Sequence, residues 1–98
     1  MRLKDAEPEL MGRAEAILDE ELLHFKAQRS DVAAVLEAAK GRAMHGGEQF
    51  VWFAPKDARE RAEHATARAL RRIGRAEGLG IGSGDTVTAD VVVRELLK

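Results

Sequence analysis

The chain has 98 residues, among them 16 lysines and arginines and 17 aspartates and glutamates, and its formal net charge is −1. This length suits one domain and is too short for two. Because the sequence contains no cysteine, disulfides and thiolate metal sites are excluded. A membrane-spanning helix needs about 18 consecutive apolar residues, and the sequence has no apolar run of that length. The N-terminus is charged, unlike that of a signal peptide. We therefore expect a cytoplasmic protein without a membrane partner.

The charges are distributed unevenly along the chain. Residues 1–35 carry eight acidic side chains against five basic ones, whereas residues 56–75 carry seven basic side chains against three acidic ones. Such an asymmetry between the two halves points to an anionic partner for the second half.

The first predicted helix covers residues 8–28. Apolar side chains recur there in steps of three and four, at Leu10, Met11, Ala14, Ile17, Leu18, Leu22 and Phe25. This spacing predicts one buried face. Pro8 and Glu9 suit the first turn of this helix. Asp19, Glu20 and Glu21 are expected together on its solvated side.

A second amphipathic helix is predicted from Asp31 to about Met44, where Gly46-Gly47 can end it. Ser30 is the expected N-cap of this helix. Because the connection between the two helices is short, we expect them to pack antiparallel as a hairpin.

Residues 48–53 form the predicted strand, since they are rich in aromatic and β-branched side chains and lie between Gly-Gly and Pro55. A strand needs a partner for its backbone hydrogen bonds. That partner is either a weak strand in the glycine run 78–84 or the same strand of a second chain. We favour the second alternative, which gives a homodimer. The candidate dimerisation residues are then Phe50, Val51, Trp52 and Phe53.

The segment 56–77 is predicted to be helical, as one helix or as two with a break near Thr66. Pro55 is expected at its first position and Asp57 in its first turn. The expected buried face consists of Ala58, Ala62, Ala65, Ala69, Leu70, Ile73 and Ala76.

A basic stripe is predicted on this segment. On an ideal helix a sector of about 100° contains Arg61, His64, Arg68, Arg71, Arg72 and Arg75. Such a stripe, if solvent-exposed, could neutralise several phosphates of DNA. The alternatives are a solvated face whose arginines pair with Glu60, Glu63 and the acidic first helix, or contact with an acidic protein.

The C-terminal segment 73–97 resembles a helix-turn-helix. Leu79-Gly80-Ile81 matches the turn, Ser83 matches the cap of the recognition helix, and Thr86-Val87 matches the residues that pack on the first helix. Asp85 or Thr88 can cap the last helix. Ser83, Thr86 and Thr88 are the candidate DNA-contacting residues of this part. The alternative is a plain helical hairpin with a flexible loop.

The remaining motifs do not indicate catalysis or a cofactor. The run Gly78–Gly84 lacks the spacing of a phosphate-binding loop. His24, His45 and His64 do not pair at a separation of four residues, so we expect no zinc site. No Ser–His–Asp set is assignable. We therefore expect neither a cofactor nor a metal, and a protein that is not an enzyme.

The order of helix, helix, Gly-Gly, aromatic strand, Pro-Lys and basic helices resembles the Mor-type phage transcriptional activators. The matching residues are Gly46 to Lys56, together with the hydrophobic pattern of residues 10–44. The resemblance implies a helical dimerisation part with an intermolecular strand pairing, followed by a helix-turn-helix. On this chain those parts correspond to residues 8–53 and 56–98 of a single domain 1–98.

The predicted fold is therefore mainly α, with a helical hairpin, one short β-strand and a C-terminal helix-turn-helix-like helical segment. The first functional hypothesis is a small non-enzymatic DNA-binding transcriptional regulator that contacts phosphates through Arg61, Arg68, Arg71, Arg72 and Arg75. The second is a protein-interaction module, an adaptor or inhibitor, that uses the acidic first helix or the aromatic strand. DNA binding requires the arginines to face solvent together with the N-terminus of the last helix.

Overall fold

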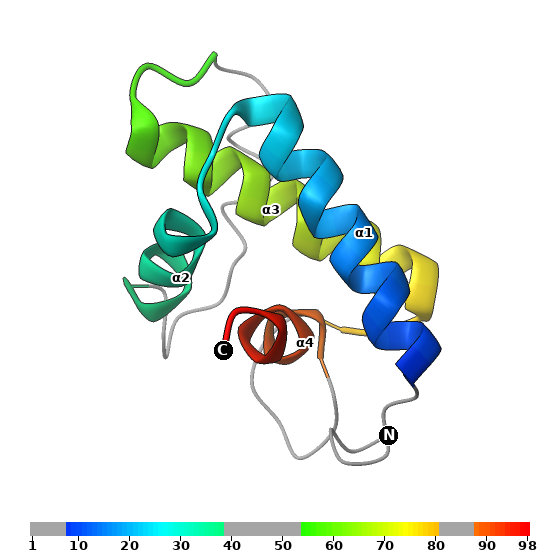
Figure 1. The fold of residues 1–98 in the computed structure, drawn as a ribbon. Helices are drawn as coiled ribbons and strands as arrows, with labels where there is room; N and C mark the ends of the chain where they lie inside the picture. Colours follow the sequence, from blue (N-terminus) through cyan, green and yellow to red (C-terminus); the bar gives the residue numbers. More distant parts are fainter. Residues whose placement is uncertain (1–7, 39–53, 81–87) are drawn as a thin grey trace.

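A computed structural model describes residues 8–38, 54–80 and 88–98. These residues form four helices, namely α1 (Pro8–Phe25), α2 (Arg29–Ala38), α3 (Ala58–Glu77) and α4 (Ala89–Leu96) (Figure 1). The prediction of a mainly α fold is confirmed, and the described ranges contain no strand. The predicted strand, with Phe50, Val51, Trp52 and Phe53, lies outside the described residues.

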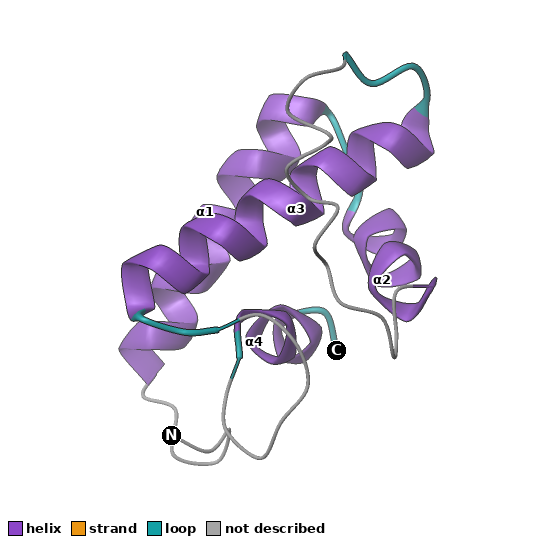
Figure 2. Cartoon of the chain, turned by 180° about the vertical axis from the view of Figure 1, so that it is seen from behind, coloured by secondary structure: helices purple, strands orange, loops and turns teal. Residues whose placement is uncertain are grey.

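The long helix α3 lies at the centre of the arrangement. α1 runs antiparallel along α3, and α2 packs on another side of α3 (Figure 1). α4 crosses α1 and α3 and is seen end-on in Figure 1 and, from behind, in Figure 2. α1 and α2 each pack mainly on α3 and hardly on each other, so the predicted hairpin is wrong. The physical reason is the set of fully buried alanines Ala62, Ala65 and Ala69, whose small side chains allow helices to approach α3 closely.

One hydrophobic core joins all four helices. Its largest fully buried apolar side chains are Leu18 of α1, Val32 of α2, Leu70 and Ile73 of α3, and Val92 and Val93 of α4. The apolar face predicted for α1 is confirmed, since Leu10, Ala14, Leu18 and Leu22 are buried in this core. The face predicted for α3 is shorter than expected, because Ala58 and Ala76, near its two ends, are exposed.

The junction between α1 and α2 differs from the prediction at both ends. α1 ends at Phe25, three residues early, because Lys26 adopts a left-handed backbone conformation with φ 55°. The N–H of Ala27 then donates to the carbonyl of Leu22 at 2.9 Å, which closes the helix end. α2 already begins at Arg29, so Ser30 lies inside the helix instead of capping it.

The start of α3 lies later than predicted. Pro55 precedes the helix, and Asp57 is the N-cap, with extended backbone and a side chain that accepts from the N–H of Glu60 at 2.8 Å. The Glu60 carboxylate in turn accepts from the N–H of Lys56 at 2.9 Å. This pair of bonds resembles a capping box, and the sequence Asp-x-x-Glu is the signal that identifies one.

α3 is one continuous helix without a break near Thr66. The Thr66 hydroxyl is buried and donates to the carbonyl of Ala62 at 2.7 Å, which satisfies it inside the helix. The helix ends at Gly78, whose φ of 68° is the left-handed conformation that favours glycine. The N–H groups of Gly78 and Leu79 both donate to the carbonyl of Gly74.

The described residues do not support the predicted helix-turn-helix. Such a motif joins its helices by a turn of about three to four residues, whereas α3 ends at Glu77 and α4 begins at Ala89. Thr88 occupies the N-cap position of α4 but makes no side-chain capping bond. Ser83, Asp85 and Thr86 lie outside the described residues.

Candidate functional site

The predicted basic stripe of α3 consists of two groups of arginines. Arg68 and Arg72 form ion pairs with α1. Arg61, Arg71 and Arg75 form no ion pair with any described residue. Arg75 is exposed, whereas Arg61 and Arg71 are half-buried. The stripe is therefore not one continuous free cationic face.

The ion pairs of Arg68 and Arg72 surround a buried carboxylate. Arg72 donates to Glu20 at 2.7 Å and to Glu21 at 3.0 Å, while the Nε of Arg68 lies 3.2 Å from the other oxygen of Glu21. The hydrogen bond to Glu20 is the largest cause of the raised pKa of Arg72, followed by that to Glu21. The Glu21 side chain is only 6% exposed, so the prediction that it lies on the solvated side of its helix is wrong. A buried carboxylate is tolerated when cations compensate it, and these two arginines do so.

His64 does not belong to an exposed stripe. Its relative exposure is 4%, and its ring centroid lies 5.5 Å from that of Phe25 at the end of α1. The inclusion of His64 among the surface cations was wrong because the pattern of a single helix does not show which of its faces a neighbouring helix covers.

Two further charged contacts tie α1 to other helices. Arg13 donates from Nε and Nη2 to the two carboxylate oxygens of Glu77, at 2.9 and 2.6 Å, and these hydrogen bonds hold the pKa of the Glu77 carboxyl below its usual value. Arg29 at the start of α2 donates to Asp19 at 2.7 Å and to Glu15 at 3.3 Å. The acidic residues of α1 therefore serve mainly as partners of arginines from elsewhere in the chain.

The N-terminus of α4 is buried. Thr88, Ala89 and Asp90 have relative exposures of 9%, 0% and 5%. The Thr88 hydroxyl donates to the Asp90 carboxylate at 2.6 Å, and that carboxylate also lies 3.6 Å from the guanidinium of Arg94. Thr88 is the one predicted recognition residue inside the described ranges, and it is not presented to solvent.

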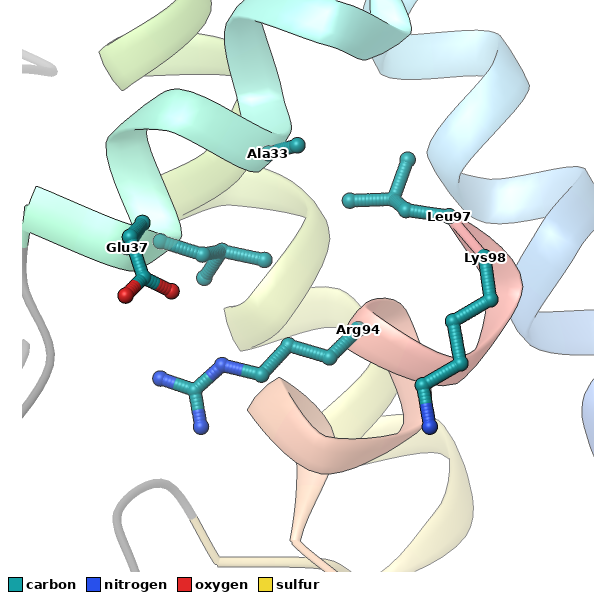
Figure 3. A pocket seen from close by; sticks show the side chains of 6 residues that line it. Ala33, Glu37, Arg94, Leu97 and Lys98 are labelled. Carbon is teal, nitrogen blue, oxygen red and sulfur yellow. The ribbon is translucent and has the colours of Figure 1, made fainter.

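A groove lies between α2 and the end of α4. The sequence did not indicate this candidate binding site. It has a volume of about 280 Å³ and is lined by Ala33, Leu36, Glu37, Arg94, Leu97 and Lys98. Figure 3 shows Leu97 facing α2 across the opening, with Arg94 reaching from α4 towards the α2 side and Glu37 on α2. The groove thus combines apolar side chains with two cations, Arg94 of α4 and Lys98 after its end, and one carboxylate of α2.

The described residues contain no group of three or more His, Cys, Asp or Glu side chains that could hold a metal ion. None of the described helices is long and apolar enough to cross a membrane.

No protein-family model matches the chain, and neither the comparison with curated proteins nor that with solved structures gives a significant match. The resemblance to Mor-type activators thus stays a prediction from the sequence.

Proposed function

We propose that this chain is a non-enzymatic protein-interaction module whose working surface is the groove between α2 and α4. The observation that carries the proposal is the composition of the groove, whose lining combines the apolar Ala33, Leu36 and Leu97 with the charged Glu37, Arg94 and Lys98. Binding surfaces typically combine an apolar centre with a polar rim. The volume of about 280 Å³ lies just below the range of about 300–1,000 Å³ for small-molecule pockets, which favours a partner side chain over a cofactor.

The internal ion pairs also support this choice of surface. Arg68 and Arg72 engage Glu20 and Glu21, and Arg29 engages Asp19. A partner that bound either the acidic helix or the paired arginines would have to compete with contacts that already hold the fold together. Relative to the sequence hypothesis, the proposal keeps the interaction module and changes its surface.

Two neighbouring alanines of α2 provide a matched test. Ala33 lines the groove and Ala34 does not, and both are exposed helical positions. Ala33→Glu places a carboxylate in the groove, whereas Ala34→Glu adds the same charge outside the groove.

The full chain and both variants are immobilised, and the proteins they retain from a lysate of the native host are quantified by mass spectrometry. We expect at least one protein retained by the parent and by Ala34→Glu to be lost with Ala33→Glu. Identical sets for all three chains would contradict the proposal, once equal melting temperatures show that all three are folded.

The DNA-binding regulator is the second candidate function, and it is favoured by the arginines that have no ion pair among the described residues. Arg71 and Arg75 lie one turn apart on α3, and Arg61 lies on the same helix. Arg75 is exposed, whereas Arg71 and Arg61 are half-buried and the Nε of Arg61 is buried, so Arg71 and Arg75 are the cations best placed to contact a phosphate. Phosphate contacts supply most of the non-specific affinity of DNA-binding proteins.

A titration of a labelled DNA duplex at several salt concentrations tests this candidate. If Arg71 and Arg75 contact phosphates, removing each of them lowers the slope of log affinity against log salt by about 0.9, irrespective of the DNA sequence. An absence of salt-dependent binding by the parent chain would contradict DNA binding. That result would leave the interaction module as the remaining candidate.

A further inference from the structure

We draw no further inference here: the strongest candidate, the exposed side chain of Leu23 near the end of α1, carries none, because nothing in the described part of the structure shows what covers it.

Discussion

Arg72 of α3 donates a hydrogen bond of 3.0 Å to Glu21 of α1, a carboxylate with 6% of its side chain exposed. The contact joins the basic half of the sequence to the acidic half. Arg68 and Arg72, two of the seven basic side chains of residues 56–75, thus pair with acids of the first half inside the molecule. Arg13 of α1 also pairs with Glu77 of α3, and Arg29 of α2 pairs with Asp19 of α1.

The two glycines inside the described helices, Gly12 and Gly74, are expected to respond in opposite ways to alanine. A Cβ on Gly74 would lie 2.8 Å from the backbone oxygen of Leu79, whereas a Cβ on Gly12 meets nothing within 4 Å. Gly12→Ala should therefore stabilise the fold by about 0.5–1 kcal/mol through helix propensity. Gly74→Ala should destabilise it, because the clash is with backbone that closes the end of α3. Urea unfolding of both variants measures this, and a stabilised Gly74→Ala would show that the turn at Leu79 shifts easily.

Lys26 is a second position where the backbone limits stability. Its φ of 55° lies in the left-handed region, which costs most residues about 1–2 kcal/mol. Lys26→Gly should raise the free energy of unfolding by about 0.5–1 kcal/mol, since glycine relieves this strain but loses more chain entropy on folding. In thermal melts this corresponds to an increase of roughly 2–8 °C for a domain of this size.

Gly78→Ala is the matched control for that prediction. Gly78 has a similar φ of 68°, and a Cβ there meets nothing within 4 Å, so the cost of alanine is conformational. Its melting temperature should fall while that of Lys26→Gly rises. An unchanged or lower melting temperature for Lys26→Gly would mean that Lys26 makes a stabilising contact outweighing its backbone strain.

The Arg13–Glu77 pair predicts a specific pH dependence. The hydrogen bonds from Arg13 lower the pKa of Glu77 in the folded chain below the unfolded value of 4.5. Its stabilising contribution is therefore complete above about pH 4.5 and is lost as the pH falls through the lower, folded pKa. Glu77→Gln should cost about 1 kcal/mol at neutral pH, and the difference from the parent should vanish in strong acid. A difference that persists unchanged in acid would show that the side chain contributes through packing instead of charge.

The sequence predicted the features that depend on local pattern. The apolar repeat of α1 identified its buried face, and the alanines of residues 62–69 identified the side of α3 that packs against its neighbours. The Asp57-x-x-Glu60 pattern is a capping signal, and the prediction that Pro55 occupies the first position of the helix is wrong. A glycine after the last turn correctly indicated where α3 ends.

The features that depend on which helix lies beside which could not be predicted in this way. Glu21 was placed on a solvated face because its burial depends on Arg68 and Arg72, which are about fifty residues away in the sequence. His64 was misplaced for the same reason, since Phe25 covers it from α1. The left-handed backbone conformation of Lys26 could not be predicted, because lysine, unlike glycine, does not favour that conformation. The groove arises only where α2 meets the end of α4, and neither segment alone indicates it.

The ion pairs of Arg68 and Arg72 hold α1 and α3 together, and we propose that this leaves the groove as the binding surface. Two double variants of α3 test the role of these arginines, since each variant replaces two arginines by two alanines. Arg68→Ala with Arg72→Ala leaves the buried Glu21 uncompensated. Arg71→Ala with Arg75→Ala removes no ion pair to a described residue.

The measurement is the free energy of unfolding of both double variants and the parent, from urea titrations at neutral pH. We expect the free energy of unfolding of the first double variant to fall by about 2–3 kcal/mol. Breaking a fully buried ion pair costs about 3–5 kcal/mol, and the expected loss is smaller because both arginines are partly exposed. The second should stay within about 0.5 kcal/mol of the parent. Equal stability of the two double variants, together with a loss of DNA affinity in the first, would contradict the account and make Arg68 and Arg72 phosphate ligands.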